Sequence, residues 1–172
     1  VGVRFDTKGA DKIASIEPEG SPELIYIEDS REGWVEALSC LIDSYLEEGS
    51  APVDFDFKRI RAYGEPIVGF GGVASGAEPL QQGLEGIRDI LTKRAKSNNP
   101  LLSSVDITDI MNIIGKIVVA GNVRRTAEIA FSSPDDTAFM EMKNWETAGV
   151  ETGAVAPEEL YMISQEDYDL YN

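Results

Sequence analysis

The sequence contains no histidine, a single cysteine and no long apolar run, and each of these shortages excludes a class of protein. Without histidine, serine-hydrolase triads and most zinc sites lose their usual base or ligand. The one cysteine, Cys40, cannot form an internal disulfide, so we expect a reducing, cytoplasmic setting. Because no apolar run approaches the roughly 18 residues of a membrane span, we expect no membrane partner.

Basic residues are also scarce, since the chain has 15 of them against 31 acidic ones and a net charge of −16 at pH 7. This balance repels the phosphates of DNA and RNA, so we expect no nucleic-acid partner. A mononucleotide remains possible, because one or two well-placed cations suffice to bind it. Solubility is the simplest role of the remaining charge, including that of the acidic tail at 146–172.

Hydrophobic periodicity predicts strands that alternate with helices, which places the chain in the α/β class. The first residues read as a strand without an initiator Met, which suggests a piece of a longer protein. Further strands are expected at 24–27, 53–57 and 127–131. Asp29 and Glu32 have the spacing of a capping box before one helix, and Ser103 and Asp106 have it before another. Pro79 stands at the start of a third helix, whose apolar face comprises Leu80, Leu84, Ile87 and Leu91.

A glycine-rich segment at 59–76 is the first candidate binding site. Glycines let backbone N–H groups approach a ligand, and Arg59 and Arg61 could bind phosphate. The segment matches neither a Walker loop nor the dinucleotide fingerprint. Tight chain connections are therefore the simpler explanation of the glycines.

The second candidate is the turn at 121–125, where two of the few basic residues, Arg124 and Arg125, stand between a helix and a strand. Ligands often bind at such turns of parallel sheets. Alternatively, the two cations only complement the dipole at the end of the helix.

Two smaller features have simple structural explanations. The pattern around Cys40 is helical, which favours a small hydrophobic role over that of a reactive thiol. Asp135 and Asp136 could bind a metal, but a helix N-cap with its first-turn acid explains them better. We therefore expect no metal site.

Four segments together resemble the adenosylcobalamin-dependent, class II ribonucleotide reductases, and most of all the monomeric ribonucleoside-triphosphate reductase type. Residues 1–6 resemble the family's VGVGFD, and residues 29–34 resemble DTREGW. Residues 69–80 resemble GFGGTASGPxPL, and residues 109–128 resemble DIxNxIGKxVVAGNVRRSAE. The segments occur in the family's order and are distributed over most of the chain up to Lys143.

The resemblance implies part of the ten-stranded α/β barrel of this family, with an inserted helical segment. Residues 1–6 would be the first barrel strand, and 7–58 an insertion that mimics a partner subunit and completes an effector site. Residues 59–145 would carry further strands and helices, together with the two loops that set substrate specificity in this family. The tail at 146–172 would follow.

The resemblance also implies site residues for a deoxynucleoside triphosphate effector and a ribonucleotide substrate. The implied effector-binding residues are Asp29, Arg31, Arg61 and Gly64. The implied specificity loop consists of Gly121, Asn122, Val123, Arg124 and Arg125. The implied substrate-proximal residues are Gly2, Ser75 and Gly76.

The chain departs from the family pattern at three single positions and lacks several of the family's catalytic segments. Ala77 replaces a proline, Thr126 a serine and Arg4 a small residue. The family's NPCGE-like motif, its pair of redox cysteines and its cobalamin-binding region are missing from the sequence, and Cys40 lies in none of those contexts. The resemblance thus implies adenosylcobalamin and a thioredoxin-type reductant for the intact reductase. It implies no catalytic residue and no bound cofactor in this chain, which would act with the remaining parts of the enzyme.

Two alternatives from other classes stay open at this point. The chain could be a noncatalytic acidic α/β module that binds a protein, with its arginines serving only as helix caps. It could also be a free-standing regulator that binds nucleotides. Against these stands the hypothesis of a reductase segment that senses an effector and sets specificity for deoxyribonucleotide synthesis.

Overall fold

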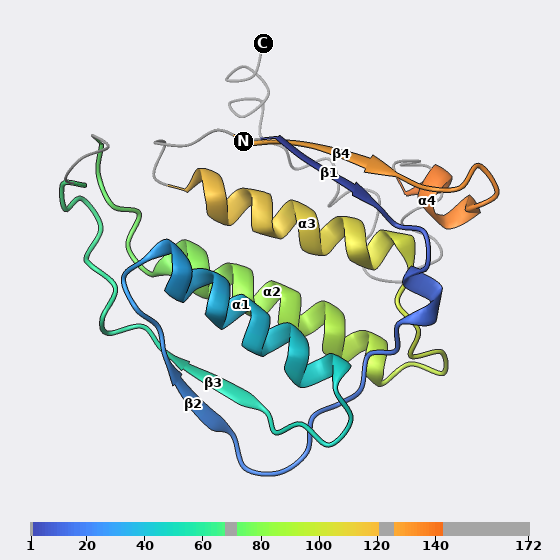
Figure 1. Ribbon diagram of the computed structural model, residues 1–172, viewed down its shortest axis with the longest axis horizontal. Helices are drawn as coiled ribbons and strands as arrows, with labels where there is room; N and C mark the ends of the chain where they lie inside the picture. Colours follow the sequence, from blue (N-terminus) through green and yellow to red (C-terminus); the bar gives the residue numbers. More distant parts are fainter. Residues whose placement is uncertain (1, 68–71, 121–125, 143–172) are drawn as a thin grey trace, which may run out of the picture. The chain divides into compact units, whose positions relative to one another are not determined.

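The computed structural model describes residues 2–67, 72–120 and 126–142. The chain divides into two compact units, 1–132 and 133–172, which are treated separately below. The first unit contains all the strands described and the three long helices (Figure 1). In chain order its elements are β1 (Gly2–Asp6), the 3-10 helix η1 (Ala10–Lys12), β2 (Glu23–Tyr26), α1 (Arg31–Leu46), β3 (Val53–Asp56), α2 (Glu78–Ala95), α3 (Ser104–Val119) and β4 (Ala127–Phe131).

The strands of the first unit form two separate parallel pairs. β1 pairs with β4 in a register that sets Gly2 opposite Ala127, and β2 pairs with β3 in a register that sets Glu23 opposite Val53. Parallel strands need a crossover connection, and α1 provides it between β2 and β3. The predicted α/β class is therefore confirmed, whereas the ten-stranded barrel stays a prediction.

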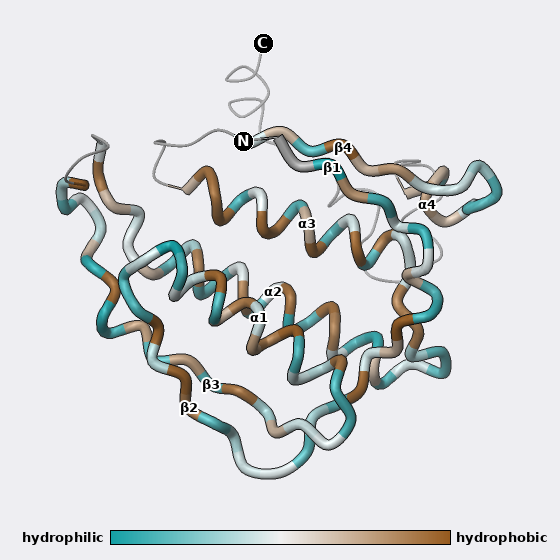
Figure 2. The backbone as a smooth tube through the Cα atoms, viewed as in Figure 1, coloured by the Kyte–Doolittle hydropathy of each residue, from teal (hydrophilic) through white to brown (hydrophobic). Residues whose placement is uncertain are grey.

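The three helices pack side by side and bury the core between them. α2 lies between α1 and α3, α1 also contacts β3, and α3 also contacts β4 (Figure 1). The predicted apolar face of α2 is confirmed, since each of its four residues is at most 2% exposed. Hydrophobic segments recur along all three helices in Figure 2, as expected of helices that share one core.

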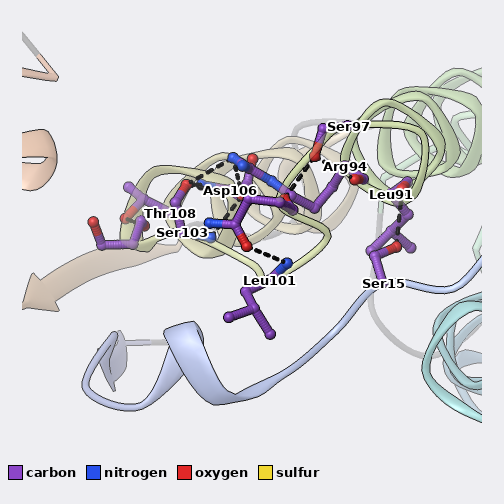
Figure 3. A network of polar contacts seen from close by, with 10 residues as sticks. Ser15, Leu91, Arg94, Ser97, Leu101, Ser103, Asp106 and Thr108 are labelled. Carbon is purple, nitrogen blue, oxygen red and sulfur yellow. Dashed lines mark hydrogen bonds and ion pairs between the residues drawn. The ribbon is translucent and has the colours of Figure 1, made fainter.

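A polar network joins the end of α2 to the start of α3 (Figure 3). Ser103 and Asp106 form the predicted capping box: the Asp106 N–H donates to Ser103 Oγ at 3.1 Å, and the Ser103 N–H donates to Asp106 Oδ2 at 2.7 Å. Arg94 of α2 lies 2.6 Å from the same carboxylate oxygen. The network fixes the entry into α3 because it satisfies backbone donors that a helix start leaves free.

The second unit contains one described helix, α4 (Thr137–Glu141). Its N-cap is Asp136, whose side chain accepts a hydrogen bond from the Phe139 N–H at 3.0 Å. The acidic pair at 135–136 thus supplies an N-cap as predicted, but the cap is Asp136, and the predicted acid in the first turn is absent from α4. Lys143 and the predicted acidic tail lie outside the described residues.

Within the described ranges, none of the helices is long and apolar enough to span a bilayer.

Candidate functional site

A cavity of about 280 Å³ opens in the first unit where α1 begins, α3 ends and the segment after β3 runs alongside them. Its wall combines a charged and polar part with a larger apolar part. It is lined by Asp29, Ser30, Arg31, Trp34, Val35, Leu38, Ile60, Arg61, Ile67, Val73, Ala74, Ser75, Gly76, Leu80, Ile114, Ile117, Val118 and Ala120. The cavity therefore brings together residues from four separate parts of the sequence.

The start of α1 is held at the cavity by a cap that differs from the predicted one. The predicted capping box of Asp29 and Glu32 is wrong, because Ser30 is the N-cap and its Oγ accepts from the Gly33 N–H at 3.0 Å. Gly33 is required here, since a Cβ on it would lie 2.7 Å from the carbonyl oxygen of Glu28. Asp29 therefore does not cap the helix, and its carboxylate can pair with a residue outside α1.

The two arginines that line the cavity are both paired with carboxylates. Arg61 Nε donates to Asp29 Oδ2 at 2.5 Å, although the two residues are 32 positions apart. Arg31 donates from Nη2 to the adjacent Glu32 at 2.6 Å, and this hydrogen bond holds the pKa of Glu32 below its ordinary value. The Arg31 pair is far more exposed than the Arg61 pair. Arg61 is therefore the cation most deeply set in the cavity wall.

A chain reversal after Arg61 supplies a further part of the cavity wall. The Gly64 N–H donates to the Ala74 carbonyl at 3.0 Å, and the Ala74 N–H donates to the Glu65 carbonyl at 2.8 Å. Gly64 and Gly76 have φ of 87° and 72°, which L side chains rarely adopt. In these two positions the glycines serve the chain reversal, as the simpler of our two interpretations proposed.

The apolar part of the cavity wall comes mainly from facing helices. Trp34 and Leu38 of α1 line it together with Ile114 and Ile117 of α3 and Leu80 of α2. Sequence patterns alone do not single these residues out, because helical spacing is the same for a core face and for a cavity wall. The sequence signal that could have identified one of them is the position of Trp34 within the DTREGW-like motif.

The structure places the predicted site residues unevenly around this cavity. Asp29, Arg31 and Arg61 line it, and so do Ser75 and Gly76, which were expected near the substrate. Gly64 lies in the adjacent turn and Gly2 on β1, and neither lines the cavity. The expected specificity loop, 121–125, lies outside the described residues, but it follows directly after Ala120, which does line the cavity.

Neither a metal site nor a reactive thiol is evident in the part of the chain that the structure describes. No group of three or more potential metal ligands lies together among those residues. Cys40 is half-buried on α1, and burial, followed by the charges of Glu36 and Asp43, raises the pKa of its thiol. This supports the packing role predicted for Cys40.

Comparison with known proteins gives a consistent result. Residues 7–91 match the family model described as the insertion domain of B12-dependent ribonucleotide reductase. The chain is 42% identical over 163 residues to a probable adenosylcobalamin-dependent ribonucleoside-triphosphate reductase of Dictyostelium discoideum, which covers 85% of this chain and 21% of that protein. It is 45% identical over 127 residues to the adenosylcobalamin-dependent ribonucleoside-triphosphate reductase of Lactobacillus acidophilus, covering 70% of this chain and 17% of that protein.

A solved structure agrees with these sequence relatives. The crystal structure of a B12-dependent, class II ribonucleotide reductase superposes with a TM-score of 0.61 at 34% identity, over 82% of this chain and 21% of that one. The chain thus spans about a fifth of the length of these relatives. It belongs to the family of adenosylcobalamin-dependent, class II ribonucleotide reductases.

Proposed function

We propose that this chain is the effector-sensing part of a ribonucleoside-triphosphate reductase, and that its cavity binds a deoxynucleoside triphosphate. One observation carries the proposal: Arg31 and Arg61 converge on a single cavity that also has an apolar wall. In a chain of net charge −16, two cations at one cavity are a local exception. A nucleoside triphosphate has matching chemistry, with an anionic end and a flat apolar base.

The positions of the groups suggest how such a ligand would lie. Guanidinium groups bind phosphate through charge-assisted hydrogen bonds, so the triphosphate would lie at Arg31 and Arg61. The same end of the cavity is the N-terminus of α1, whose dipole also favours an anion. The base would lie against Trp34, Leu38 and Ile117, where apolar surface is buried on binding.

The route from this cavity to substrate choice would run through the loop at 121–125. Val118 and Ala120, just before that loop, line the cavity, so a bound ligand would lie next to the start of the loop. If Asn122, Arg124 and their neighbours also contact the substrate base, the binding of the effector and the binding of the substrate are coupled. Such couplings are typically about 1–3 kcal/mol, enough to change specificity from several-fold to about a hundredfold. Ser75 and Gly76, together with Gly2 on β1, would belong to the substrate side.

The chemistry of reduction would take place in the intact reductase, within the ten-stranded barrel of which this chain would form part. Adenosylcobalamin would supply the radical there, and a thioredoxin-type protein the reducing equivalents. This cavity does not fit the cofactor, because its volume of about 280 Å³ is too small for a corrin ring and its side chains. We therefore assign no step of the reduction to this chain.

Direct binding measurements test the proposal. Trp34 lines the cavity, so a W145F variant of the full chain leaves Trp34 as its only tryptophan and as a fluorescent reporter. Titration with each of the four deoxynucleoside triphosphates should change this fluorescence for at least one of them. R61A should weaken that binding about tenfold or more, as expected for loss of a charge-assisted hydrogen bond.

The matched control is R59A. Arg59 is two residues away and pairs with Glu28, but it does not line the cavity. The R59A variant should therefore bind deoxynucleoside triphosphates nearly as tightly as the wild type. Equal losses in R59A and R61A would indicate a nonspecific charge effect, and no response to any of the nucleotides in calorimetry as well would refute effector binding by this chain.

A further inference from the structure

The carboxylate of Asp29 occupies the arginine that would otherwise be available to a phosphate. Arg61 Nε and Asp29 Oδ2 are 2.5 Å apart, and both side chains line the cavity. About a third of each side chain is exposed, 35% for Arg61 and 30% for Asp29. Water therefore screens this pair less than it screens a pair on the open surface.

A neighbouring ion pair already joins the two chain segments, so the Asp29–Arg61 pair is not needed for that purpose. Arg59 pairs with Glu28, so the same two chain segments are joined twice. The side chains of the Arg59 pair are more exposed, at 54% and 59%, and neither residue lines the cavity. The outer pair can hold the segments together by itself, which leaves the inner pair free to break when a ligand arrives.

An anionic ligand at Arg61 would meet Asp29 in two ways. It would compete with the carboxylate for the Nε–H donor, and it would lie next to a negative charge, which repels it. Both effects act against any polyphosphate, whatever group is attached to it. They disappear if the carboxylate becomes an amide, which has nearly the same size and shape but no charge.

Building on the proposed effector site, we propose that Asp29 is a built-in competitor for Arg61, an autoinhibitory contact that a polyphosphate must displace. The ion pair keeps the main cation of the cavity neutralised, so single phosphates and other small anions bind poorly. Only a ligand with several negative charges, or with further contacts to the apolar wall, gains enough to replace the carboxylate. Asp29 thereby raises the ligand concentration that is needed to fill the site.

Inorganic tripolyphosphate is the probe that tests this, because it carries the charges of a nucleotide without sugar or base. Contacts of Asp29 to other parts of a nucleotide cannot then affect the result. Calorimetry on the full chain should show that D29N binds tripolyphosphate more tightly than the wild type, by about threefold to tenfold for the removal of one partly buried competing pair. D29S should act in the same direction.

E28Q is the matched control, since it removes the same charge one residue earlier, at the outer pair. It should change the affinity for tripolyphosphate less than twofold. D29N/R61A should lose the gain, because the donor that Asp29 blocks is then absent. Thermal unfolding of each variant shows whether it is folded under the conditions of the titration.

The sign of the D29N effect decides the proposal. Unchanged or weaker tripolyphosphate binding in D29N, or no detectable binding in both proteins, would overturn it, because Asp29 would then not compete. An equal gain in E28Q would overturn it as well. The proposed function is judged separately: a deoxynucleoside triphosphate that binds wild type through Arg61 supports effector binding even if D29N shows no gain.

Discussion

Gly83 of α2 lies directly against Ile117 of α3, so closely that a Cβ on Gly83 would be 2.6 Å from Ile117 Cγ1. Real side chains do not approach to this distance. The backbones of the two helices can come this near only because position 83 has no side chain. Ile117 also lines the cavity, so this contact links the packing of α2 on α3 with the shape of the candidate site.

We predict that G83A destabilises the first unit. Moving Ile117 Cγ1 requires a change of χ1, which is stiff in a β-branched residue within a helix. Overpacking of this kind costs about 1–3 kcal/mol, and the better helix propensity of alanine offsets up to about 1 kcal/mol of it. Urea unfolding should show a net loss of stability, and ligand binding at the cavity should weaken.

Gly86, one turn later on α2, provides the control. A Cβ there would lie 3.3 Å from Ile113 Cδ1, the mobile end of a side chain. G86A should therefore be neutral or slightly stabilising. If G83A unfolds at the same urea concentration as G86A, the close approach of the two helices at Gly83 is not rigid.

The capping box of α3 gives a second prediction. S103A removes the hydroxyl that accepts from the Asp106 N–H, and this should lower the free energy of unfolding by about 1 kcal/mol. Asp106 keeps the Ser103 N–H and Arg94 as partners, so the loss should not be larger. S39A, an exposed change in the middle of α1, should be close to neutral in the same denaturant series. Equal stability of the two variants would show that the cap contributes nothing.

Most elements of the first unit could be predicted from the sequence, because local patterns determine them. Leu80, Leu84, Ile87 and Leu91 recur at helical spacing and are all buried on α2. The cap of α1 was predicted one residue too early, because Asp29 and Ser30 are both good capping residues. What separates them is the contact of Asp29 with Arg61, which is 32 positions later and invisible to local patterns.

The candidate site was predictable in part for the same reason. Asp29 and Arg31 belong to a short motif that carries the family resemblance, and Arg61 stands in the glycine-rich segment that was the first candidate site, so these charged residues were found. Its apolar wall was not, since Leu38 and Ile114 have the spacing of ordinary core residues. Only packing in three dimensions shows that they border a cavity.

Cys40 should react slowly with alkylating agents. Burial raises the pKa of its thiol, and the carboxylates of Glu36 and Asp43 raise it further, so little thiolate is present at neutral pH. The rate of reaction with iodoacetamide should increase with pH and reach its midpoint above that of free cysteine. E36Q should move the midpoint downward, but less than unfolding in urea does, because burial is the larger cause. A midpoint at or below that of free cysteine would contradict this.

The stability of the chain should depend on pH through Asp109. Partial desolvation raises the pKa of this carboxyl, although its side chain also reaches solvent, and the charge of Asp106 adds to the effect, so folding disfavours its ionised form. The penalty is complete above the folded pKa and absent below the unfolded value of about 3.9. D109N should therefore be more stable than the wild type at pH 7, by an amount that shrinks as the pH falls toward 4. D89N, the same change at another exposed position, on α2, corrects for the loss of one negative charge. A D109N advantage that grows on acidification would have the wrong sign for this explanation.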